Sequence, residues 1–270
     1  MSTTITQAMI DDFDSNVHFL GQQKVSRLFG KWYDRTGMAE AFKFDTLAPS
    51  DMAAKTGRHG VTPINDIVHG ARWAPMEVWD WGEAVDPDDD AQVIIDPRGK
   101  YVRSAGMAWG RRLDDTAIAA LGGTAITGKD KSGTQVLPSG QKLGASATAA
   151  DKMTVDLLRQ AKALLDKAEV GSGERVAVIS AESLQDLLED PEVTSADYNT
   201  VRALVNGEIN QYLGFEFVRT ERLPLTTNTR LNYFYDKECL GFASAMKEFT
   251  RVGEDPGYRF MTRIFKSTVI

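Results

Sequence analysis

The sequence predicts a body of the α/β or α+β class, in which helices and strands are interleaved along the chain. Two segments, 96–121 and 151–168, have the periodicity of amphipathic helices. The run ERVAVIS at 174–180 is rich in β-branched residues, which is typical of a buried strand. Three more strand candidates complete the pattern, at 212–220, 231–243 and 258–270.

The N-terminal region contains an interrupted amphipathic pattern. Apolar residues recur at helical spacing between Phe13 and Phe29, with a break near Gly21. A segment of this kind is loosely held unless a neighbour covers it. We expect either a docked helix or an arm that reaches another chain.

Residues 50–95 change from small and basic to aromatic and then acidic. Three of the five tryptophans fall between Trp73 and Trp81, although Pro75 excludes a central strand at that point. We expect a two-stranded excursion that packs on the body or on another subunit, because isolated hairpins are marginally stable in water. Its two limbs carry opposite charges that would set the register between neighbours, namely Arg58 and Arg72 on one limb and Asp86, Asp88, Asp89 and Asp90 on the other.

Residues 96–121 predict a long helix of about 37 Å at 1.5 Å per residue. Asp96 suits the N-cap and Pro97 the first helical position, while Gly122 and Gly123 suit its end. One buried stripe is expected, formed by Val102, Ala105, Trp109, Leu113, Thr116 and Ala120.

The same helix carries four charged residues close together. Arg111 and Arg112 lie within one turn of Asp114 and Asp115. We expect these charges to pair with one another on the outer faces of the helix.

A polar, Gly-rich loop and a helix at 151–168 come next, followed by a strand–helix block. The strand at 174–180 turns at Ser180 into a short helix that Pro191 ends. The capping-box spacing of residues 194–197 predicts one further helix, which Gly207 ends.

Composition limits the class of protein. Of 270 residues, 42% are hydrophobic and 26% charged, which is typical of a globular chain. The net charge of −7 argues against tight binding to duplex DNA or to an anionic membrane, because both need a basic surface. No apolar run approaches the roughly 18 residues that span a bilayer. The N-terminus lacks the basic start of a secretory signal, and we expect a cytoplasmic site of synthesis.

Candidate motifs for catalysis are incomplete. Ser180 lies at a strand-to-helix turn, but the glycines of a hydrolase nucleophile elbow are missing, and a helix N-cap explains it better. The run GGTAITGKDKSGT fails the spacing of a phosphate-binding loop and is interpreted as a solvated loop. No set of acid, base and nucleophile emerges, which favours a structural or binding protein over an enzyme.

Candidate metal ligands are equally incomplete, and no cofactor is expected. Asp86, Asp88 and Asp90 alternate as in calcium loops, but without the glycine and distal glutamate of that motif, which favours a charged rim. The three histidines, His18, His59 and His69, are scattered. Cys239 is the only cysteine, so no intrachain disulfide or thiolate zinc cluster is possible, and we expect it in the core.

The order of these segments resembles the major capsid protein of tailed double-stranded DNA bacteriophages, the Hong Kong 97-type fold. The phrases that carry the resemblance are DPRGKYVRSAGMAWGRRLDDTAIAALGGTA, ISAESLQDLLEDPEVTSADYN and INQYLGFEFVRTERLP, and it covers nearly the whole chain. It implies a non-enzymatic protein with an α+β fold. Conspicuous apolar surface outside the core fits a shell subunit, because such surface marks interfaces.

The resemblance also implies a division of the chain into four parts. These are an N-terminal arm at 1–52, an extended loop at 53–95 lying across a neighbouring subunit, a peripheral domain at 96–170 and 231–270 with a spine helix at 96–121, and an axial domain at 171–230. The candidate inter-subunit contacts are Arg58, Arg72, Trp73, Trp79, Trp81, Asp86, Asp88, Asp89 and Asp90.

The partners it implies are those of a virion. Copies of the chain would assemble through pentamers and hexamers into an icosahedral shell enclosing the genome. Scaffolding and portal proteins would be partners, double-stranded DNA would be packaged without sequence-specific binding, and no membrane would be involved. Assembly would take place in the host cytoplasm. Three alternatives stay open: a non-viral shell-forming compartment of the same fold, a tail or neck component, and an α/β enzyme acting through Ser180 or the Asp86–Asp90 cluster.

Overall fold

The computed structural model describes residues 22–55, 57–58, 64–86, 98–144, 152–171, 173–189, 211–226, 229–258 and 260–270. Several expected features lie outside the described residues, namely the cap at Asp96 and Pro97, the helix after residue 194, the acidic run Asp88–Asp90, and His18 and His59.

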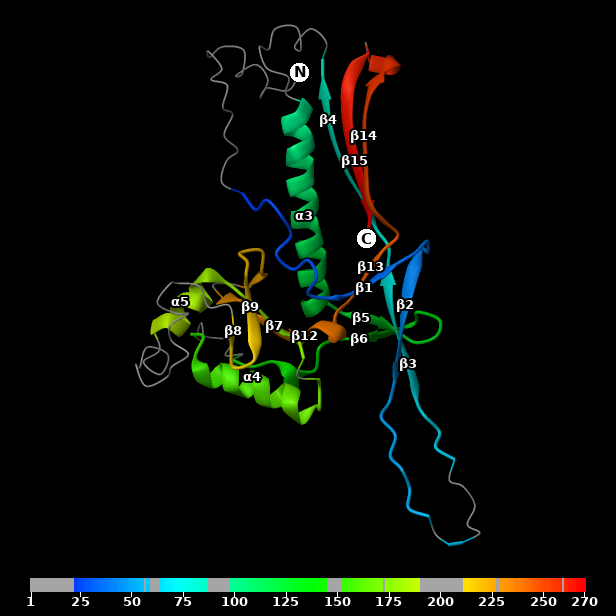
Figure 1. Ribbon diagram of the computed structural model, residues 1–270, viewed down its shortest axis with the longest axis vertical. Coiled ribbons are helices and arrows are strands. Elements are labelled where there is room, and N and C mark those ends of the chain that lie inside the picture. The colour runs from blue at the N-terminus through cyan, green and yellow to red at the C-terminus, as the bar shows by residue number, and fades with distance from the viewer. Residues whose placement is uncertain are drawn as a thin grey trace.

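A long helix and a narrow sheet form one end of the molecule, and a projecting hairpin forms the other (Figure 1). Helix α3 (Arg98–Gly122) lies beside an antiparallel sheet of order β14-β15-β4, made of Met246–Asp255, Met261–Val269 and Val78–Val85. The hairpin of β2 (Ala41–Leu47) and β3 (His69–Pro75) points away from them along the longest axis (Figure 1). The predicted long helix is therefore confirmed.

A second sheet lies to the side of α3, with strand order β12-β7-β9-β8. Its central strand β7 (Arg175–Ile179) pairs in parallel with β9 (Phe215–Arg219) and antiparallel with β12 (Tyr233–Asp236), and β8 (Gln211–Tyr212) forms the edge. All five residues of β7 are buried. The predicted strand at 174–180 is confirmed.

The second sheet is buried on both faces, and alternate residues of β7 serve the two cores. Ala177 and Ile179 join a lateral cluster with α4 (Val155–Lys167) and α5 (Ala181–Glu189), which supply Leu158 and Leu187 among others. Val176 and Val178 instead face a central cluster that includes residues of α3. This double burial explains why β7 is a continuous apolar run rather than an alternating one.

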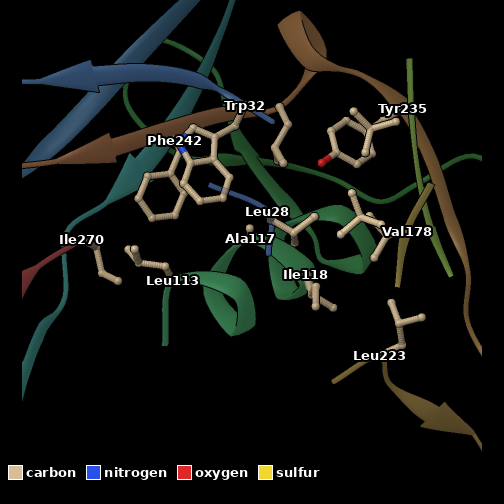
Figure 2. Close-up of a cluster of buried hydrophobic side chains, with 13 residues drawn as sticks. Leu28, Trp32, Leu113, Ala117, Ile118, Val178, Leu223, Tyr235, Phe242 and Ile270 are labelled. Carbon is tan, nitrogen blue, oxygen red and sulfur yellow. The ribbon is translucent and has the colours of Figure 1, made fainter. Parts of the chain in front are cut away.

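The central cluster collects side chains from segments far apart in the sequence (Figure 2). Leu28 lies near its middle, between residues of α3 and Tyr235, and is fully buried (Figure 2). Trp32 stacks on Phe242 with ring centroids 4.5 Å apart. Burial raises the pKa of the Tyr235 phenol, and the negative charges of Asp114 and Glu216 act in the same direction. The cluster has 13 buried members: Leu28, Trp32, Leu113, Ala117, Ile118, Val176, Val178, Val218, Leu223, Tyr235, Leu240, Phe242 and Ile270.

The expected single stripe on the long helix is only partly correct. Ala105 and Leu113 are buried, but Val102 is 36% exposed and Ala120 is exposed. Two segments cover α3 from different sides: β15 contacts Trp109, while residues 25 and 26 pass directly over Gly110. The buried surface is consequently wider than one stripe.

The expected pairing among the four charges of α3 is wrong, because each has a partner elsewhere. Arg111 donates to the Gln22 side chain at 2.6 Å, and Arg112 stacks on Trp79. Asp114 is fully buried and accepts from residues 23–28. Asp115 accepts from Nε and Nη2 of Arg222, each at 2.5 Å, and these hydrogen bonds raise the pKa of Arg222.

The expected extended loop at 53–95 has different bounds in the structure. Residues Ala41–Leu47 pair with His69–Pro75, and the contact continues where the Ala48 amide donates to the Val68 carbonyl at 3.0 Å. Residues Val78–Val85 instead pair with β15 along their whole length. The chain changes partner at Glu77, whose backbone exchanges two hydrogen bonds with Ile270.

Short elements complete the described fold. β1 (Tyr33–Thr36) pairs in parallel with β13 (Gly241–Ser244), and β10 (Leu225–Thr226) pairs with β11 (Thr229–Arg230). β5 (Ala125–Thr127) and β6 (Gly133–Gln135) extend the hairpin sheet to the order β2-β3-β5-β6. Three short 3-10 helices are η1 (Ser139–Gln141), η2 (Lys237–Cys239) and η3 (Pro256–Tyr258).

Two further expectations are corrected. Cys239 is exposed in η2 rather than buried in a strand, because η2 separates β12 from β13. Residues 22–29 form no helix, so the amphipathic pattern in the described part of 13–29 arises from irregular chain docked on the central cluster.

We predict that Leu158→Ala lowers the free energy of unfolding by about 2–5 kcal/mol, because Leu158 is fully buried in the lateral cluster and the variant leaves a cavity. Urea denaturation of the purified chain measures this. Val136→Ala is the control, since Val136 is 65% exposed and its loss should change stability by less than about 0.5 kcal/mol. Equal stability of the two variants would contradict the assigned core.

Candidate assembly interface

The described residues include no cluster of metal ligands. Within the described ranges, no three histidine, cysteine, aspartate or glutamate residues are grouped so that they can hold a metal ion. No helix in the described part of the chain has the length and apolar character to cross a membrane. Surfaces that carry unburied apolar side chains are therefore the features to examine.

Ser180, the candidate nucleophile, caps helix α5. Its side chain is buried, and its Oγ accepts from the Ser183 amide at 3.1 Å. Asn232 closes the network, accepting from the Ser180 amide at 3.2 Å and donating to the Ser183 hydroxyl at 2.8 Å. The predicted N-cap role is confirmed.

Trp79 and Trp81 face the subunit's own long helix. They pair across the sheet with Thr268 and Lys266 of β15, and paired residues share one face of a sheet. Both of these β15 residues meet Trp109 of α3: Thr268 Oγ1 accepts from its indole nitrogen at 3.4 Å, and Lys266 Nζ lies 5.2 Å from its ring centroid. Both tryptophans thus contribute to packing within the subunit, and their expected contact with a neighbouring subunit stays a prediction.

Arg112 reinforces this arrangement. Its guanidinium carbon lies 3.2 Å from the centroid of the Trp79 ring, which is a close cation–π contact. Trp79 in turn packs against the central cluster. Removing the indole would therefore disturb the subunit before it disturbed any contact between copies.

Trp73 fixes the base of the hairpin. Its indole nitrogen donates to the Gly128 carbonyl at 2.7 Å, and Lys131 Nζ lies 4.9 Å from its ring centroid. Gly128 and Lys131 belong to the turn between β5 and β6, and both have positive φ angles, 89° and 57°. The hairpin is thereby attached to the chain that directly follows α3.

The charged candidates do not lie on two limbs of one hairpin. Arg58 is exposed in the segment that joins β2 to β3, and Arg72 is exposed in β3. Asp86 follows β4, which belongs to the sheet beside α3, and Asp88, Asp89 and Asp90 lie outside the described residues. The expected opposition of charges between two limbs is therefore wrong for Asp86.

The far part of the hairpin carries apolar side chains that the sequence reasoning did not single out. Met52 is 100% exposed and Ile64 94%. Leu47, Ile67 and Val68 are exposed along the two limbs that lead to them. These residues lie in a polar stretch of sequence without periodicity. Only the structure, by placing them on a projecting hairpin, shows that they form exposed apolar surface.

A second apolar surface lies at the opposite end of the molecule (Figure 1). It includes Val252 in the second half of β14 and Tyr258 and Phe260 in and after η3, all exposed, while Phe249, nearer the start of β14, is exposed on the opposite face of the strand. Phe249 and Phe265 meet edge to face with centroids 6.4 Å apart. Two different apolar surfaces at opposite ends of one chain suit head-to-tail contacts between copies, which close into rings.

Comparison with known proteins identifies a matching family. A family model described as phage capsid protein matches residues 5–270. No curated protein matches the chain.

Solved structures of capsids share the fold. The capsid protein of the cyanophage P-SCSP1u matches with a TM-score of 0.73 and 18% identity, over 96% of this chain and 88% of that one. That of cyanophage Pam1 matches with a TM-score of 0.71 and 14% identity, over 96% and 90%. The capsid of a native GTA particle matches with a TM-score of 0.57 and 14% identity, also over 96% and 90%.

We predict that Trp79→Ala lowers the free energy of unfolding of the subunit by about 2–4 kcal/mol. This is slightly less than the loss typical of a fully buried aromatic side chain, because Trp79 is only partly buried. Urea denaturation followed by circular dichroism measures it. Met52→Ala is the control, because the Met52 side chain is fully exposed and its truncation should leave stability unchanged. A Trp79→Ala variant with normal stability and defective assembly would return this tryptophan to the interface.

Proposed function

This chain belongs to the phage capsid protein family, and we propose that its copies assemble through pentamers and hexamers into an icosahedral shell around packaged double-stranded DNA. It is a shell protein of the virion, and copies of the same chain are its main partners. The single observation that carries the mode of assembly is the hairpin β2–β3, which projects from the body with its apolar side chains exposed.

The proposed contact places the far part of this hairpin on a neighbouring subunit. Leu47, Met52, Ile64 and Val68 would be buried there, and each contributes about 1.5–3 kcal/mol if burial is complete. Asp51, Lys55 and Arg58, all exposed, form the polar surroundings and are proposed to set the register, as Arg58 and Arg72 were expected to do.

The proposed division of the chain follows the sheets. The extended loop corresponds to residues 41–75, and β4 with the following segment belongs to the peripheral domain, together with 96–170 and the C-terminal strands. The axial domain comprises 171–230 and also β12, because β12 pairs with β7 in one sheet. The N-terminal arm is then the chain before β2.

The finer features of the virion assignment are proposals as well. Scaffolding and portal proteins are the proposed partners during assembly in the host cytoplasm, and no membrane takes part. The net charge of −7 supports packaging of DNA without sequence-specific binding. A structural role without enzymatic activity is supported by the family and by the use of the Ser180 hydroxyl as a helix cap.

One alternative, a non-viral compartment of the same fold, shares all these contacts. Extraction of nucleic acid from purified particles separates the two: protected double-stranded DNA supports the virion, and particles that hold only protein support the compartment.

The hairpin contact is tested by Met52→Ser combined with Ile64→Ser. We expect the wild-type chain, expressed alone or with its neighbouring reading frames, to form closed particles in negative-stain microscopy and velocity sedimentation. The double variant should remain unassembled with an unchanged unfolding midpoint, because both side chains are exposed in the subunit. Val136→Ser, at an exposed position away from the hairpin, is the matched control. Normal particles from the double variant would exclude the hairpin as the contact.

A further inference from the structure

The segment before β1, residues 22–32, crosses the second half of α3 without belonging to any helix or sheet. We call this segment the strap. It ends at β1, where the Tyr33 amide donates to the Leu240 carbonyl at 2.9 Å. We propose that the strap opens and closes as a unit, and that closure, governed by Asp114, locks α3 to the sheet of β7 and β9.

Asp114 is the main polar attachment of the strap. The carboxylate is fully buried, and both of its oxygens accept from the strap. Oδ1 accepts from the Ser26 hydroxyl at 2.6 Å and from the Leu28 amide at 3.1 Å. Oδ2 accepts from the Arg27 amide at 3.0 Å and from the Gln23 side chain. A buried carboxylate depends on such donors, because losing them leaves a charge without compensation.

Gly110 allows the strap to come this close. A Cβ at position 110 would lie 2.9 Å from the Ser26 nitrogen and 3.3 Å from the Val25 carbonyl carbon. Both are backbone atoms, which cannot turn aside as a flexible side chain can. A glycine in the interior of a helix lowers its stability by about 1 kcal/mol relative to alanine. At this position the close approach of the strap backbone requires glycine despite that loss.

The strap contacts the second sheet as well as α3. Lys31 Nζ forms an ion pair with Glu216 of β9 at 2.5 Å, and Arg27 donates to the carbonyl of Arg219 at 2.5 Å. Leu28 fills the middle of the central cluster, between residues of α3 and Tyr235 (Figure 2). When closed, the strap therefore adds contacts between two elements that also meet through the rest of that cluster and through the Asp115–Arg222 pair.

The attachment is of a kind that can be released. Apart from the turn in which the Lys31 amide donates to the Leu28 carbonyl, the strap is held by side chains rather than by a backbone ladder. Its outer side is open, with Val25 71% and Phe29 61% exposed. Opening must also withdraw Leu28 and Trp32 from the central cluster, so we expect the strap to open locally at a free energy below, but close to, that of global unfolding. In an assembled shell a neighbouring copy would contact this outer side, and that statement rests on the proposed function. The opening of the strap in the isolated subunit does not rest on it.

Hydrogen–deuterium exchange on the unassembled full-length chain tests the proposal. Asp114→Asn keeps the side-chain volume but replaces one carboxylate oxygen by an NH2 group. The strap donors that face this group then lose their acceptor. We expect exchange in strap peptides to accelerate by about tenfold to a hundredfold, because the variant loses one or two charge-assisted hydrogen bonds that hold the strap closed. Peptides from α4 in the lateral cluster should keep the wild-type rate. Asp115→Asn is the matched control, because it removes the neighbouring charge without touching the strap.

Gly110→Ala supplies an independent route to the same state, and remains informative if Asp114→Asn does not fold. It leaves the carboxylate in place, favours the helix, and displaces the strap by contact alone. Faster exchange confined to the strap in this variant supports the proposal. Wild-type exchange of the strap in Gly110→Ala, or uniform acceleration in strap and α4 together, would overturn it. Because no shell is needed, the outcome does not depend on whether particles form.

Discussion

Burial of the central cluster is the constraint on which the rest of the fold depends. Its 13 members come from the strap, α3, the sheet of β7 and β9, β13, the end of the chain at Ile270, and two connecting segments that supply Leu223 and Leu240. None of these segments buries enough apolar surface alone to offset the entropy of ordering it. Their positions are therefore fixed together, and the long helix and the second sheet are oriented relative to each other by this cluster.

The two ends of the molecule extend away from this core and contribute little to it. Among the described residues, three strands, β14, β15 and β4, lie beside α3 at one end, and at the other no helix or further sheet covers the far part of the hairpin. Apolar side chains at both ends consequently remain exposed, as with Met52 on the hairpin and Phe260 beyond η3. In a protein that acts alone such surface favours aggregation, whereas in a shell subunit it is the surface through which copies associate.

Local signals predicted much of this fold, and non-local pairing accounts for most of what they missed. Helix α3 was predictable from its periodicity and its closing glycines, and β7 from its apolar run. The partner of residues 78–85 was not, because β15 lies almost two hundred residues away and Trp79 and Trp81 suit a hairpin as well as a sheet beside a helix. Asp114 looks like a surface charge at helical spacing, and only the donors of the strap make its burial possible.

The attachment of the hairpin has a mechanical consequence. β3 pairs with β5, which begins three residues after α3 ends, and Trp73 bonds to the turn that follows β5. The hairpin is thus attached at its base to the segment that follows the C-terminal end of the long helix, and its far end projects freely from that point. At about 3.3 Å per residue, the ten steps from Ala41 to Asp51 give an arm of roughly 33 Å, so a rotation of about 5° at the base moves the far end by about 3 Å. In the proposed shell, small rotations about this attachment would let identical copies follow the different curvatures around five-fold and six-fold positions.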